Sequence, residues 1–107
     1  MFLCRSSELD NNQSMRFDQS SFQFFILRRN NKVYAYRNAC PHIGVTLDWA
    51  PNQFFSSDGE LLQCSTHGAL FIPETGACVS GPCRGQSLTQ LSVEERNGEI
   101  HLYESPE

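Results

Sequence analysis

The chain has 107 residues and a formal net charge of −4, and its pI is about 5.3. This length suits one small domain, and the acidic balance provides no basic face for a nucleic acid. No apolar run is long enough to cross a bilayer, and Met1–Arg5 is too short for the hydrophobic region of a signal peptide. These limits predict a cytoplasmic protein without membrane association, monomeric in isolation, whose five cysteines are metal ligands or free thiols rather than a disulfide framework.

Short apolar stretches separated by turn signals begin near the start of the chain. Cys4 is expected as a small buried residue of a first strand. Apolar runs at 22–27 and 33–36 flank Asn30-Asn31, which predicts a β-hairpin. Farther along, the turn signal 57–60 comes directly before an apolar pair and indicates another strand.

The last part of the chain carries the strongest turn signal. Apolar residues at 91–93 and 100–102 alternate with polar ones on either side of Asn97-Gly98. Asn-Gly favours a hairpin because both of its turn positions adopt positive φ. We therefore predict a hairpin whose strands include residues 91–93 and 100–102.

Regularly spaced short strands predict an all-β fold, an antiparallel β-sandwich or barrel. Residues 38–85 differ from the rest, because they hold four of the five cysteines and four of the five prolines. We expect residues 1–107 to form a single domain in which about 38–85 make a loop-rich, cofactor-binding subdomain.

Two compact pairs within that region carry the chemistry. They are Cys40-Pro41-His42 and Cys64-Ser65-Thr66-His67, separated by 21 residues. Each pair offers one thiolate and one imidazole at the tip of a short turn. Cys40, His42, Cys64 and His67 are therefore the candidate metal ligands.

Two metal centres suit a set of two cysteines and two histidines. Tetrahedral zinc usually takes its two cysteines from one short motif and its two histidines from another. In a 2Fe–2S cluster with mixed ligands, one iron takes both cysteines and the other both histidines. Because each loop here contributes one residue of each kind, the pattern favours the iron–sulfur cluster over zinc.

These loops resemble the cluster loops of the Rieske ferredoxin family. Residues 38–44 are similar to the first loop, 64–71 followed by Thr75-Gly76 to the second, and Gly81-Pro82-Cys83 to the proline-containing loop that covers the cluster. The resemblance implies one 2Fe–2S cluster per chain. The spacer between the ligand pairs is longer than is usual in the family, which leaves the shape of 49–57 open.

The resemblance also implies a one-electron carrier rather than an enzyme. With two histidines committed to the cluster, only His101 remains, so a second iron site with two histidines cannot be assembled. No glycine-rich phosphate loop follows a strand. The expected partners are a reductase and an oxygenase-like terminal oxidoreductase. The alternatives are a small subunit of a nitrite-reductase-like assembly and a structural zinc-binding module.

Several other residues have competing interpretations. Family members with high potentials have a serine and a tyrosine where this chain has Ala69 and Phe71, so we expect a midpoint below roughly +100 mV. Cys78 and Cys83 are interpreted as free thiols in preference to a redox pair. His101 is expected to be an exposed strand residue. Trp49 suits a docking surface and simple packing equally well.

Overall fold

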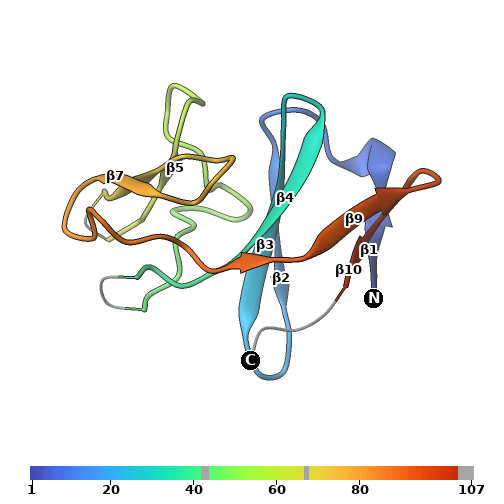
Figure 1. The fold of residues 1–107 in the computed structure, drawn as a ribbon, viewed down its shortest axis with the longest axis horizontal. Helices are drawn as coiled ribbons and strands as arrows, with labels where there is room; N and C mark the ends of the chain where they lie inside the picture. The colour runs from blue at the N-terminus through green and yellow to red at the C-terminus, as the bar shows by residue number, and fades with distance from the viewer. Residues whose placement is uncertain (42–43, 67, 104–107) are drawn as a thin grey trace.

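The computed structural model describes residues 1–41, 44–66 and 68–103. Its strands form three antiparallel sheets, and the only helical element among these residues is a short 3-10 turn, Ser6–Glu8 (Figure 1). The all-β antiparallel prediction is therefore confirmed. None of the described segments is a helix of the length and apolarity needed to cross a bilayer.

The sheets divide the chain into a central layer with one sheet on either side. The central sheet has the order β2 (Ser14–Asp18), β3 (Gln23–Arg29), β4 (Lys32–Arg37) and β8 (Gln90–Leu91). A second sheet has the order β1 (Phe2–Arg5), β10 (Glu99–Leu102) and β9 (Val93–Arg96). The third has the order β5 (Leu62–Gln63), β6 (Leu70–Phe71) and β7 (Cys78–Ser80). We call residues 38–88, which contain the third sheet and its long loops, the lobe.

Both hairpins predicted from their turn residues are present. Asn30 and Asn31 join β3 to β4 with φ of 53° and 66°. Asn97 and Gly98 join β9 to β10 with φ of 54° and 76°. Positive φ at both turn positions twists the turn in the sense that matches the flanking strands.

The prediction of one strand through residues 91–93 was wrong. Leu91 pairs with Ala35 in the central sheet, whereas Val93 pairs with Leu102 in the second sheet. The chain therefore changes sheet at Ser92. Leu91 and Val93 nevertheless pack against the same apolar core, so the bend keeps both side chains out of water.

Strand β3 is buried on both of its faces. Phe24 and Ile26 belong to the core shared with the second sheet, while Phe25 and Leu27 belong to the core shared with the lobe. All four are fully buried. Successive side chains of a strand point to opposite faces, so a continuous apolar run is what a strand between two layers requires.

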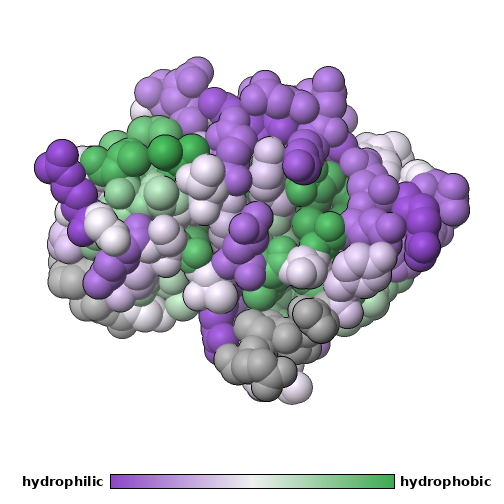
Figure 2. All heavy atoms as spheres, viewed as in Figure 1, coloured by the Kyte–Doolittle hydropathy of each residue, from purple (hydrophilic) through white to green (hydrophobic). Residues whose placement is uncertain are grey.

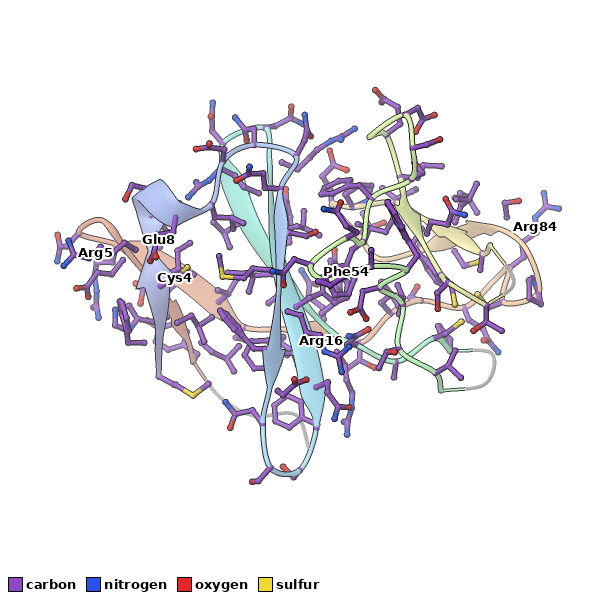
Figure 3. All side chains as sticks on the ribbon, turned by 180° about the vertical axis from the view of Figure 1, so that it is seen from behind. Cys4, Arg5, Glu8, Arg16, Phe54 and Arg84 are labelled. Atoms are coloured by element: carbon purple, nitrogen blue, oxygen red, sulfur yellow. The ribbon has the colours of Figure 1, made fainter. Side chains whose placement is uncertain are left out.

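The long spacer docks onto the central sheet. The ring of Phe54, which Figure 3 labels, stacks on Phe25 of the central sheet with centroids 4.1 Å apart. Arg16 forms an ion pair of 2.9 Å with Asp48, and its backbone N–H donates to the Asn52 side chain at 2.8 Å. These contacts give 49–57 the defined shape that the sequence left open.

Candidate functional site

The first ligand loop turns back on itself around Cys40. The Cys40 N–H donates to the Val45 carbonyl at 2.7 Å, and the Gly44 N–H donates to the Cys40 carbonyl at 2.6 Å. Gly44 has φ of +77°, which a side chain would strain. Cys40 is only 3% exposed, so the loop holds its thiol at the buried base of the turn.

The second ligand loop repeats this arrangement around Cys64. The Cys64 N–H donates to the Ala69 carbonyl at 2.9 Å, and the Gly68 N–H donates to the Cys64 carbonyl at 3.1 Å. The sequence offsets are the same as in the first loop, and Gly68 also has positive φ. Cys64 is 1% exposed. The two loops are thus built alike, each with a buried cysteine at its base.

The two loops are tied to each other and to the central sheet. The Ser65 N–H donates to the Leu47 carbonyl at 2.9 Å, and the Ser65 hydroxyl donates to the Thr46 carbonyl at 3.1 Å. Buried Asn38, which follows β4, accepts a hydrogen bond of 2.7 Å from the Leu47 N–H and donates to Asp48. Sequence reasoning placed Asn38 in the first-loop motif but assigned it no contact, because the contact depends on how the loop folds back toward β4.

A third loop packs against the second. A Cβ atom on Gly81 would lie 2.8 Å from the Ala69 Cα atom, so only glycine allows this approach. Gly81 also has φ of +100°. This is the loop whose Gly81-Pro82-Cys83 sequence suggested a covering role, and Cys83 is 1% exposed beneath it.

Cys83 contacts Cys78 and shares a buried core with Cys40. Its thiol donates to the Cys78 sulfur at 3.1 Å. Burial first, and then hydrogen bonding with Cys78 and the charge and hydrogen bonding of Cys40, raise the pKa of the Cys83 thiol to about 12. Cys83 therefore stays protonated at neutral pH and contributes a thiol, rather than a thiolate, to this region.

Two of the four predicted ligands lie in the described part of the chain. Cys40 and Cys64 belong to one apolar core, which also includes Phe25 and Tyr36 of the central sheet. His42 and His67 lie outside the described residues. Gly44, Ser65 and Thr66 of these loops are exposed, in contrast to the buried cysteines. Pro41 and Gly68, which adjoin the histidines in the sequence, are half-buried.

His101 lies far from the ligand loops, in β10 of the second sheet. Its side chain is only 25% exposed, so the expectation of an exposed residue was wrong. The imidazole packs edge-on against Phe2, with centroids 5.7 Å apart, and lies 3.0 Å from Glu99. The ring packs against Phe2 of the neighbouring strand β1 rather than contacting solvent freely.

Trp49 is 53% exposed, and its indole N–H donates to the Phe55 carbonyl at 3.1 Å. Its ring is held at one end and open to solvent on the rest, which excludes a core position. Elsewhere on the surface, hydrophobic side chains gather over the lobe in the view of Figure 2.

Comparison with known proteins agrees with this geometry. The sequence profile of the Rieske [2Fe-2S] domain family matches residues 1–101. Cholesterol 7-desaturase of Caenorhabditis elegans is 33% identical in an alignment of 113 positions that covers 94% of this chain. The chain spans 24% of that relative's length.

Two solved structures share the fold. The ferredoxin of carbazole 1,9a-dioxygenase from Nocardioides aromaticivorans superposes with a TM-score of 0.76 and 24% identity, covering 95% of this chain and 94% of that one. The Sphingomonas yanoikuyae ferredoxin gives a TM-score of 0.76 and 19% identity, covering 98% of each chain.

The chain belongs to the Rieske [2Fe-2S] domain family. Its cofactor is accordingly a Rieske 2Fe–2S cluster, and the zinc alternative is set aside. The resemblance of the ligand loops to the Rieske family is thereby confirmed. Two buried thiols at the bases of matched loops suit the cysteine side of such a cluster.

Proposed function

We propose that Cys40, His42, Cys64 and His67 hold the cluster, and that the chain passes one electron at a time between protein partners. The observation that carries this proposal is the matched backbone pattern of the two loops, which presents Cys40 and Cys64 alike. One cysteine from each loop would bind one iron, and one histidine from each loop the other. Residues 1–107 would then act as a single unit with 38–85 as the cluster-binding subdomain.

Each part of the loops has a distinct task in this proposal. The cluster supplies reversible one-electron chemistry, with potentials in this class from about −150 to +300 mV. The buried bases at Cys40 and Cys64 exclude water from the thiolate side. Exposed Gly44, Ser65 and Thr66 offer a partner a surface on the ligand loops, and we expect the electron to pass there.

Ligand substitutions test the assignment. Cys64→Ala and His42→Ala are expected to lose iron, acid-labile sulfide and the electron paramagnetic resonance signal of the reduced cluster. Cys4→Ala removes an equally buried thiol in β1, and His101→Ala removes an imidazole in β10; both should keep the full signal. A signal lost in His101→Ala, or retained in Cys64→Ala, would refute the ligand set.

For the partners, we propose a reductase as donor and an oxygenase-like oxidoreductase as acceptor, in the cytoplasm. The complex of reduced oxygenase and oxidized ferredoxin in carbazole 1,9a-dioxygenase contains a chain that superposes on this one with a TM-score of 0.80. That likeness, at 24% identity, supports a ferredoxin-like role. Anaerobic stopped-flow mixing of the reduced protein with a candidate oxygenase should oxidise it in a single exponential phase.

A second candidate function is that of the electron-entry domain of a longer oxidoreductase. The similarity to cholesterol 7-desaturase favours it, because that relative is about four times as long. The mass of the polypeptide in its native source separates the two functions. A mass near 12.1 kDa favours the ferredoxin, and a much larger one the fused domain.

A further inference from the structure

Two cysteines outside the proposed ligand set lie close enough to react with each other. Cys78 begins β7 and is 7% exposed, and Cys83 lies in the loop after β7 and is 1% exposed. Their sulfur atoms are 3.1 Å apart. A disulfide bond is about 2.05 Å long, so the sulfurs need to approach by only roughly 1 Å.

The backbone already holds the two cysteines together. Cys78 donates its N–H to the Gln86 carbonyl at 2.9 Å, and the Gln86 N–H donates to the Cys83 carbonyl at 2.9 Å. Gln86 therefore closes the loop independently of any bond between the sulfurs. The main local contact that must yield is the hydrogen bond of 3.2 Å from the Cys78 thiol to the Ser80 carbonyl.

The chain segment around the two cysteines consists mainly of exposed residues. All residues of 79–82 and 84–87 are exposed, and Cys83 is the one buried residue among them. Arg84 lies at the outer end of the lobe, where it projects into solvent (Figure 3). A small displacement of this loop would open the pair to a small oxidant, whereas a folded protein would be excluded.

We propose that Cys78 and Cys83 form a reversible dithiol–disulfide couple, separate from the cluster ligands, which low-molecular-weight disulfides oxidise. One thiol loses its proton and attacks the small disulfide, breaking its S–S bond and releasing one small thiol. The second cysteine then attacks the mixed disulfide and releases the other small thiol. The protein gives up two electrons and two protons, and the small disulfide takes up both.

Oxidation of the pair would alter the neighbouring cluster ligand. Cys83 and Cys40 belong to the same buried core. A disulfide removes the polar Cys83 S–H from the core that holds Cys40. Donors to cluster sulfurs stabilise the added electron, so oxidation of the pair should lower the midpoint potential. This consequence rests on the proposed function, whereas the disulfide itself does not.

The test uses the cluster-loaded protein, equilibrated anaerobically in buffers of varied ratio of reduced to oxidised glutathione. Samples are quenched in acid, alkylated in denaturant and mapped by mass spectrometry. We expect a Cys78–Cys83 link at oxidising ratios, reversed by dithiothreitol, together with a lower midpoint and an unchanged resonance signal. Cys4→Ser, a matched change at a remote buried thiol, should behave like the wild type. In Cys78→Ser the midpoint should not respond to glutathione.

Each other outcome has a defined meaning. Full alkylation of Cys78 and Cys83 at every ratio, while the resonance signal persists, would overturn the proposal. So would a Cys40–Cys83 link accompanied by loss of the cluster. A link without any shift of the midpoint would overturn the effect on the cluster. Absence of iron would contradict the proposed function, and the peptide map would still decide on the disulfide. The map of the wild type decides even if Cys78→Ser does not fold.

Discussion

At the residue scale, contact between the third loop and the second ligand loop depends on a missing side chain at Gly81. Substitution with alanine would place a Cβ 2.8 Å from the Ala69 Cα and 3.1 Å from its Cβ. The backbone of Ala69 accepts the hydrogen bond from Cys64, so a shift there is transmitted to the ligand loop. A sequence shows the glycine, but only the fold shows what it approaches.

Gly81→Ala is therefore expected to destabilise the cluster-loaded protein by about 2–4 kcal/mol, adding overpacking to the strain of positive φ. The measurement is the apparent thermal midpoint of cluster loss at a fixed heating rate. Gly85→Ala is the matched control, because Gly85 has φ of +92° and open space around it. It should lose only about 1–2 kcal/mol from backbone strain. Equal losses in both variants would mean that the contact with Ala69 is not limiting.

Ala69 provides a test of how the lobe sets the midpoint potential of the cluster. It is fully buried, and its carbonyl closes the loop of Cys64. Ala69→Ser adds an O–H donor, and a donor to a cluster sulfur stabilises the reduced state, so the midpoint potential should rise. Protein-film voltammetry measures it, with Ala50→Ser in the spacer as the control. An unchanged midpoint would show that position 69 does not face the cluster.

At the element scale, the success of sequence reasoning follows the range of the interactions. The Asn97-Gly98 hairpin was predicted because its turn depends on local backbone preferences. The change of sheet at Ser92 was missed because it depends on the strands with which Leu91 and Val93 pair in the folded protein. The docking of the spacer was equally inaccessible, since the stacking of Phe54 on Phe25 joins distant parts of the chain.

The parts of the candidate site that could be predicted from the sequence are likewise those that depend on local patterns. The ligand candidates were found because a metal site can be recognised from the types of its ligands and their short spacings in the sequence. The contacts of Asn38 and Gly81 depend on how the loops fold, and no spacing in the sequence predicts them. Cys78 and Cys83 were recognised as a possible pair but were interpreted as free thiols. The pairing of His42 and His67 with the cysteines stays a prediction.

An ion pair between Arg28 and Glu95 joins β3 to β9 across two sheets. Two hydrogen bonds of 2.7 and 2.9 Å connect the groups, and the Arg28 side chain is 12% exposed. The hydrogen bond from Arg28 is the main cause that lowers the pKa of Glu95 below its ordinary value of 4.5. Because the pKa is lowered in the folded state, the ion pair stabilises the fold above pH 4.5. This stabilisation is lost as the pH falls through the pKa that Glu95 has in the folded protein.

Glu95→Gln should accordingly cost about 1–2 kcal/mol at pH 7, which corresponds to a decrease of roughly 4–16 °C in the thermal midpoint. The difference from the wild type should shrink as the pH is lowered from 5 to 3.5. Differential scanning calorimetry across this range measures it. Glu60→Gln is the control, because Glu60 is 70% exposed and its pair with Arg29 should contribute almost nothing. A difference that is constant with pH would exclude the ion pair as its cause.

At the scale of the whole molecule, its two sides, the central sheet and the lobe, differ in how they are held together. The hairpin of β3 and β4 has strands of seven and six residues, whereas the strands of the lobe have two or three. Short strands provide few ladder hydrogen bonds, so the lobe depends on its core and on its metal centre. That core nevertheless includes Phe25 and Tyr36 of the central sheet, which couples the two sides.

Removal of the cluster should therefore loosen the lobe before it unfolds the molecule. In hydrogen–deuterium exchange of protein stripped of iron by a chelator under reducing conditions, amides of 62–80 should lose protection by a factor of ten or more, about 1.4 kcal/mol. Amides of the β9–β10 hairpin should keep most of theirs, because their core contains none of the proposed ligands. Uniform loss of protection would mean that the cluster holds the entire fold, and unchanged protection in the lobe would mean that its loops are organised without any metal.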